Sequence, residues 1–200
     1  MITSPTKCLL SIFCGMITLC SIVPSSIGSK PKPNSHSYIS KKPNYTQLKK
    51  LLAAGKWKEA DLETWKQMAM FSKSGDNYLT SDEMNNFPCN HLGILNQLWL
   101  KSSKNRFGFS VQRKIWQNFG GKANFDENIY RKFVIRVGWY TKDSTVIGGY
   151  RTINTNNLNY SLKAPPGHLP GIPLSDYGVG GGFGGASGWR FIPRAAFCKI

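Results

Sequence analysis

The chain has 200 residues, of which 40% are hydrophobic and 18% are charged, and it carries a formal net charge of +16 with a pI of about 9.8. This length permits one domain of ordinary size with an appendage, and the hydrophobic fraction excludes wholesale disorder. The charge favours a negatively charged partner, such as a polyanion, an anionic membrane surface, an acidic protein or a ligand with carboxylates. A solvated basic surface without a dedicated partner explains the charge equally well.

The N-terminal segment contains an uncharged apolar run from Cys8 to Val23, preceded by Lys7 and followed by small and polar residues. The run is typical of a secretory signal peptide, and it suits a membrane anchor if its flanks extend it to the roughly 20 residues that span a bilayer. Both alternatives stay open for residues 1–29. An uncleaved anchor keeps the domain on the cytoplasmic side, because lysines follow the run closely, whereas a cleaved signal exports it. Residues 30–44 are basic and rich in Pro and Ser, which predicts a linker able to touch anionic lipid headgroups.

Apolar residues at helical spacing predict a domain of short helices over residues 45–177. In chain order the predicted elements are an apolar stripe at 48–52 closed by Gly55, a helix over 57–71, a brief turn capped by Ser81, a helix capped by Asn90, a helix over 111–119 capped by Ser110 and a helix that starts at Asp126. Residues 140–160 are polar and predict a loop, and residues 178–200 predict a glycine-rich, mobile C-terminal tail. Because strand signals are weak throughout, the predicted fold class is all-α.

No catalytic constellation is evident, so the sequence predicts a protein that is not an enzyme. The histidines His36, His91 and His168 lie in a linker, at a helix start and in a proline turn, without a nucleophile and an orienting acid nearby. For His168, structural hydrogen bonding is the favoured interpretation. Cys89 and Cys198 lie beyond the apolar run, and they either form a disulfide in an exported domain or remain buried thiols. No metal site and no required cofactor are expected.

The most informative segment lies where a loop meets a predicted helix. Phe107 and Phe109 flank Gly108 there, with Arg106 before them and Arg113 one helical turn later. Rings at such a junction line clefts, and guanidinium groups beside them bind carboxylates through charge-assisted hydrogen bonds. This combination suits a planar ligand that carries carboxylates. Among the other large rings, those expected in the core are Trp57, Trp65 and Phe133.

Several blocks of the sequence occur in the order of a known family. These blocks are Gly55-Lys56-Trp57-Lys58-Glu59-Ala60-Asp61, Gln97-Leu98-Trp99, residues 105–116, Val137-Gly138-Trp139 and residues 161–170. In this order they resemble the genomes-uncoupled-four family, the porphyrin-binding activators of magnesium chelatase. The resemblance covers residues 45–170, and it is most specific in 105–116 and 161–170, where whole strings match.

The resemblance implies a small cupped all-helical domain with a long mobile loop and a groove for protoporphyrin IX or Mg-protoporphyrin IX. It implies a non-catalytic, monomeric protein that regulates or stimulates magnesium chelatase in chlorophyll biosynthesis. The chelatase large subunit is then a partner, met on the cytoplasmic or stromal face of a membrane. The residues expected to contact the ligand are Leu98, Trp99, Arg106, Phe107, Phe109, Gln112, Arg113, Trp116, Trp139, Tyr150, Arg151 and His168.

Two other functions stay open. The glycine-rich ending and the N-terminal apolar run depart from the family pattern, which favours an exported or membrane-attached porphyrin carrier or sensor without chelatase contact. Positive charge combined with aromatic residues also suits a module that binds single-stranded nucleic acid. No recognised nucleic-acid motif accompanies that charge, so nucleic acid is the less favoured partner.

Overall fold

The computed structural model describes residues 43–73, 75, 79–145, 149–153, 155–171 and 191–200. Contacts divide the chain into two units, Met1–Ile39 and Ser40–Ile200, and every described residue belongs to the second. The predicted signal or anchor, most of the predicted linker and the glycine-rich stretch 178–188 lie outside the described residues. Within the described ranges, no helix is both long enough and apolar enough to cross a membrane.

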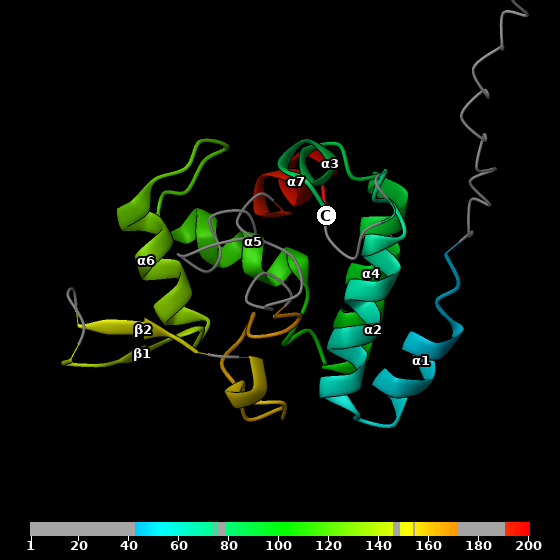
Figure 1. The fold of residues 1–200 in the computed structure, drawn as a ribbon, viewed down its shortest axis with the longest axis horizontal. Helices are drawn as coiled ribbons and strands as arrows, with labels where there is room; N and C mark the ends of the chain where they lie inside the picture. The colour runs from blue at the N-terminus through cyan, green and yellow to red at the C-terminus, as the bar shows by residue number, and fades with distance from the viewer. Residues whose placement is uncertain (1–42, 74, 76–78, 146–148, 154, 172–190) are drawn as a thin grey trace, which may run out of the picture. The chain divides into compact units, whose positions relative to one another are not determined.

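The described part of the chain is mostly α-helical, which confirms the predicted fold class (Figure 1). Its helices are α1 (Thr46–Ala53), α2 (Trp57–Ala69), α3 (Ser81–Asn85), α4 (Cys89–Ser102), α5 (Phe109–Asn118), α6 (Glu127–Arg136) and α7 (Phe191–Phe197). The stretch predicted as loop contains a short antiparallel hairpin, formed by β1 (Tyr140–Lys142) and β2 (Tyr150–Thr152), and the 3-10 turn η1 (Thr155–Asn157).

Two helix starts are set by side-chain caps. Asp126 caps α6 as predicted, because its carboxylate accepts a hydrogen bond from the Ile129 N–H at 2.9 Å. At α3 the cap is Thr80 and not Ser81. The Thr80 hydroxyl accepts from the Glu83 N–H, while the Glu83 carboxylate accepts from the Thr80 N–H. This reciprocal pair places the cap one residue earlier than the sequence predicts.

The prediction that Asn90 and Ser110 cap helices is wrong, since both lie inside a first turn. Pro88 precedes α4, and its ring holds φ at −62° without supplying a side-chain cap. Gly108 precedes α5 with φ 131° and ψ 163°, a region that essentially only glycine occupies. A Cβ added at Gly108 would lie 2.9 Å from Asn96 Oδ1. The junction between α4 and α5 therefore requires glycine on both conformational and steric grounds.

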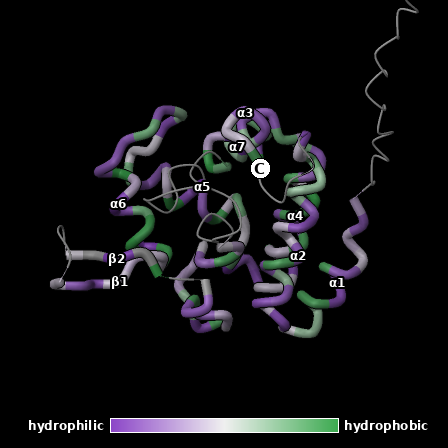
Figure 2. Tube along the Cα trace, in the orientation of Figure 1, coloured by the Kyte–Doolittle hydropathy of each residue, from purple (hydrophilic) through white to green (hydrophobic). Residues whose placement is uncertain are grey.

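The buried apolar side chains form two clusters. One draws on α1, α2, α4 and the junction and includes Trp57 and Trp65, whereas the other draws on α5, α6 and β1 and includes Phe133. The predicted core positions are thus confirmed. Figure 2 shows that α2 and α4 each carry hydrophobic and hydrophilic residues, as expected of helices that bury one side.

Helix α7 lies in a stretch that the sequence predicts as tail. Phe191, Ile192 and Ala195 are buried, so α7 packs as part of the core. Cys198 follows it and forms a disulfide with Cys89, the first residue of α4, at a Cα–Cα distance of 5.2 Å. The structure thus shows these two cysteines paired and not as free thiols. An element as short as α7 offers too few apolar positions for a periodic pattern, which is why the sequence does not predict it.

Substitution of Gly108 by alanine tests whether the junction depends on glycine. We expect Gly108→Ala to lower the free energy of unfolding by about 1–3 kcal/mol, because alanine must adopt a backbone conformation reserved for glycine. Urea denaturation followed by circular dichroism measures the change.

Gly93→Ala is the matched control. Gly93 lies inside α4, and an added Cβ there would meet its nearest neighbour, Ile200 Cγ2, at an ordinary 3.9 Å. We expect this substitution to raise the free energy of unfolding by about 0.5–1 kcal/mol, because alanine favours the helix interior over glycine. If Gly108→Ala lowered the free energy of unfolding no more than Gly93→Ala does, the requirement for glycine at the junction would be contradicted.

Candidate functional site

The turn between α4 and α5 is held by polar side chains of α4. Ser103 Oγ donates to the Trp99 carbonyl at 2.7 Å and accepts from the Phe107 N–H at 2.8 Å. Asn96 Oδ1 accepts from the Ser110 N–H at 2.9 Å. These bonds satisfy buried backbone donors where the chain leaves the helix, so the turn is fixed relative to α4.

A row of hydrogen bonds fixes residues 164–171, called here the clamped segment, against this turn. Its carbonyl groups at 167–170 all accept hydrogen bonds. Gln112 Nε2 donates to the Gly167 carbonyl at 3.0 Å and to the Pro170 carbonyl at 2.9 Å. Trp139 Nε1 donates to the His168 carbonyl at 2.8 Å, and the Gly108 N–H donates to the Leu169 carbonyl at 2.9 Å. Three donors far in sequence from this segment thereby set the course of four consecutive residues.

Arg106 makes two further bonds to the clamped segment. Its Nε donates to the Ala164 carbonyl at 2.7 Å, and its own carbonyl accepts from the Gly167 N–H at 2.9 Å. The side chain is half-buried. Arg106 therefore has a structural role in this structure, and its predicted contact with a ligand carboxylate stays a prediction.

His168 is also part of this network, which confirms the structural interpretation of its ring. Nε2 accepts a hydrogen bond from the Asn159 N–H at 3.1 Å, so the ring proton is on Nδ1, which donates to the Val137 carbonyl at 2.7 Å. Burial lowers the pKa of His168, partly opposed by the bond to Val137. Both ring nitrogens are thus engaged, and neither is available to ligate the metal of a porphyrin.

A buried carboxyl group, Asp61 of α2, holds the end of the clamped segment. Asp61 Oδ1 accepts from the Gly171 N–H at 2.9 Å, and the residue is only 6% exposed. Burial raises the pKa of Asp61 from 3.8 to about 7, although the bond from Gly171 opposes that shift. Burial and the nearby Asp61 charge also raise the pKa of Tyr160. The sequence reasoning missed Asp61, yet a signal was present: a lone carboxylate on the otherwise largely apolar inner side of α2.

One side of α5 carries an unsatisfied donor and two aromatic residues. Phe109, Arg113 and Trp116 are spaced by four and three residues, which places them on the same side of the helix. Arg113 is half-buried, and its Nε is buried without a hydrogen-bond partner among the described residues. Leaving a buried donor unsatisfied costs about 1–3 kcal/mol, so an anion bound at this position would be stabilising.

Helix α7 lies against this side of α5. The Phe109 ring packs on Phe191 with the ring centroids 6.2 Å apart, and Ile192 lies in the same buried cluster as Trp116. Phe109 is 4% exposed and Trp116 is 2% exposed. In this structure α7 therefore covers Phe109, whereas the Trp116 ring packs against Phe133 of α6 with the centroids 6.0 Å apart.

The expectation that Phe107 and Phe109 stand open to a ligand is not met in this structure. Phe107 is fully buried, with ring centroids 5.8 Å from Trp57 and 6.4 Å from Trp99. The backbone conformation at Gly108 directs the chain so that both neighbouring rings enter the core. Leu98 is half-buried beside that core. Contact of these residues with a ligand stays a prediction.

The predicted contacts in residues 140–160 lie on the hairpin and not at the junction. Arg151, on β2, forms an ion pair with Asp143, the residue after β1. Tyr150 lies on β2 opposite Lys142. The structure thus brings together the predicted residues of α4, α5, Trp139 and His168, while the two hairpin residues belong to a separate element. In the described ranges, no group of three or more His, Cys, Asp or Glu residues is placed to hold a metal ion.

The fold and contacts together define the class of protein. It is a small α-helical domain in which hydrogen bonds hold the clamped segment against the turn between α4 and α5. Within this class the chain belongs to the GUN4-like family, whose model matches residues 39–175, more than half of the chain. The resemblance inferred from the sequence blocks is thereby confirmed.

Solved structures of this family share the fold. GUN4 from Chlamydomonas reinhardtii superposes with a TM-score of 0.54 at 28% identity, covering 76% of this chain and 87% of that one. The ligand-free structure of Arabidopsis thaliana GUN4 gives a TM-score of 0.51 at 25% identity, covering 63% of this chain and 80% of that one.

Curated relatives show similar levels of identity. The chloroplastic tetrapyrrole-binding protein of Arabidopsis thaliana is 32% identical over 123 residues, which are 57% of this chain and 43% of the relative. The Ycf53-like protein of Synechocystis sp. is 28% identical over 130 residues, which are 64% of this chain and 50% of the relative. The chain thus spans about half the length of the curated relatives that it matches.

The raised pKa of Asp61 predicts how stability depends on pH. Between about pH 4 and pH 7 the folded protein holds the Asp61 proton more tightly than the unfolded chain does, so this group's contribution to the free energy of unfolding falls as pH rises. Asp61→Asn keeps an oxygen that accepts from Gly171 and removes the titration. We expect the stability of the variant relative to the natural protein to increase with pH across this window, as urea denaturation at several pH values would measure.

Glu59→Gln controls for the loss of a negative charge from α2, because Glu59 is exposed on the same helix. This variant should show the same pH dependence as the natural protein. If Asp61→Asn and Glu59→Gln behaved alike, the dependence would not originate in the buried carboxyl group.

Proposed function

We propose that this protein binds a tetrapyrrole of the protoporphyrin class and acts as a non-catalytic regulator. Membership in the GUN4-like family supports this proposal, as does a relative named as a tetrapyrrole-binding protein. The single structural observation that carries it is Arg113, whose buried Nε lacks a partner among the described residues and which shares one side of α5 with Phe109 and Trp116.

The chemistry of this α5 side suits a porphyrin acid. A propionate group would accept hydrogen bonds from the Arg113 guanidinium, and a charge-assisted bond of this kind contributes about 1.5–3 kcal/mol. Phe109 and Trp116 would pack against the macrocycle, each contributing about 0.5–1.5 kcal/mol beyond the burial of apolar area. Apolar packing provides affinity and the cation sets orientation, as in most small-molecule sites.

A finer proposal concerns the ligand and the partner. The family resemblance favours protoporphyrin IX and Mg-protoporphyrin IX as ligands and magnesium chelatase, through its large subunit, as the enzyme regulated. Because both nitrogens of His168 are engaged, His168 would not hold the magnesium of the second ligand. The macrocycle would then be recognised by its rings and carboxylates.

Arg113→Ala tests the proposed site. We expect the variant to bind protoporphyrin IX about 10- to 100-fold more weakly than the natural chain, because one charge-assisted bond is lost. Titration of the full chain, followed at the Soret absorption band, measures this difference. The titration is run on the disulfide-bonded protein and on the reduced protein.

Lys114→Ala is the matched control, since Lys114 is the adjacent cation on α5 and is exposed. Equal weakening by both substitutions would show that general positive charge attracts the ligand and would reject Arg113 as the anchor. Absence of Soret changes in both redox states would reject tetrapyrrole binding. Salt-sensitive binding of a single-stranded oligonucleotide would then favour the nucleic-acid alternative.

A further inference from the structure

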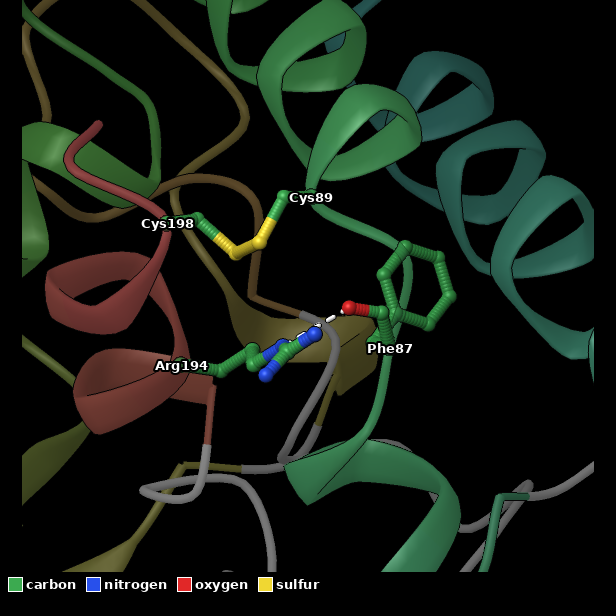
Figure 3. The surroundings of a disulfide bond; sticks show 4 residues. All are labelled: Phe87, Cys89, Arg194 and Cys198. Atoms are coloured by element: carbon green, nitrogen blue, oxygen red, sulfur yellow. Dashed lines mark hydrogen bonds between the residues drawn. A yellow bond between two sulfur atoms is a disulfide. The ribbon is translucent and has the colours of Figure 1, made fainter.

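Helix α7 and the residue after it are bonded to the start of α4 and to the residue two positions before it (Figure 3). Cys198 forms the disulfide with Cys89, and Arg194 Nε donates to the Phe87 carbonyl at 2.7 Å. Phe191 completes the contact, because its ring lies against Phe87 with the centroids 5.9 Å apart. The covalent and hydrogen bonds thus connect α7 to the same short stretch of chain, from Phe87 to Cys89.

The same helix covers the proposed tetrapyrrole site. Phe191 packs on Phe109, and Ile192 shares a buried cluster with Trp116. A macrocycle cannot stack on Phe109 while the Phe191 ring packs against it. Access to the α5 side therefore depends on whether α7 stays in place.

The attachment of α7 depends strongly on the disulfide. An α-helix of 7 residues is far shorter than the roughly 12–15 residues that give a marginally stable isolated helix in water. Its order therefore comes from the packing of its few buried side chains and from its bonds to α4. Loss of the covalent bond leaves one short helix held by the packing of its buried side chains and by the Arg194 hydrogen bond, and weakly held elements open before the rest of a domain.

We propose that the Cys89–Cys198 disulfide is a redox latch that keeps α7 over the tetrapyrrole-binding side of α5, and that reduction by a dithiol opens this side. The inference rests on the proposed function and names its regulation. Both cysteines are half-buried, so part of the disulfide is accessible to an attacking thiolate.

The reduction balances as an ordinary thiol–disulfide exchange. One thiolate of the dithiol attacks a sulfur of the Cys89–Cys198 bond and forms a mixed disulfide, releasing the other cysteine as a thiolate. The second thiol of the reductant then attacks the mixed disulfide. The products are two protein thiols and the oxidised reductant, with two electrons and two protons transferred to the protein.

The test compares porphyrin binding by the full chain in the two redox states. Protoporphyrin IX is titrated into the disulfide-bonded protein and into protein reduced with dithiothreitol. We expect the dissociation constant to fall at least about tenfold on reduction, because apparent affinity scales with the fraction of molecules in the open state. Hydrogen exchange of the α7 amides should accelerate in parallel.

Two variants separate the latch from other cysteines. Cys198→Ser should bind protoporphyrin IX as the reduced protein does, without dithiothreitol, and should not respond to it. A variant with Cys8, Cys14 and Cys20 changed to Ser retains the latch and should respond fully. Circular dichroism of the reduced natural protein checks that the domain stays folded, so the test stands even if Cys198→Ser does not fold.

The outcomes distinguish the latch from the proposed function. Equal binding in both redox states, or α7 amides equally protected in both, would overturn the latch and leave tetrapyrrole binding intact. A response lost in the Cys8, Cys14 and Cys20 variant would likewise overturn it. No binding in either state would remove the proposed function, and the latch with it.

Discussion

The position of the clamped segment depends on two hydrogen bonds from the side-chain amide of Gln112. This amide is buried on α5 and donates to two backbone carbonyls, at Gly167 and Pro170, that have left water on folding. An unsatisfied buried carbonyl costs about 1–3 kcal/mol, so no apolar side chain of similar size replaces this amide. With these two carbonyls bound, the Trp139 indole donates to the His168 carbonyl and the Gly108 N–H donates to the Leu169 carbonyl.

This constraint explains what the recognised sequence blocks do. Arg106, Gly108 and Gln112 lie in one block and Trp139 lies in another, yet all four bond to the block that contains His168. These bonds, three of which use side-chain donors and one the Gly108 N–H, hold the domain together. The blocks therefore identify the family through the requirements of its fold, and the proposed function assigns ligand binding to Arg113, whose Nε lacks a partner among the described residues.

The sequence predicts those helices that are determined by residues close together in the chain. Apolar periodicity and a capping carboxylate were sufficient for α6, and the indole-rich side of α2 indicated a core. Features created by distant partners were not predictable from local pattern. The bond between Asp61 and Gly171 joins positions 110 residues apart, and the burial of Phe107 depends on rings from α2 and α4. Adjacency of rings and arginines in the sequence indicated a ligand cleft, whereas packing placed Phe107 in the interior.

The cross-link between α4 and the C-terminal end has a consequence for chain integrity. It joins positions separated by 109 residues, so every element from α4 onward belongs to one closed covalent ring. A protease that cuts one peptide bond inside the ring, for instance in the hairpin, releases no fragment. Such a nicked molecule would migrate as a single species until a thiol is added, and its two pieces would remain together through any transient unfolding.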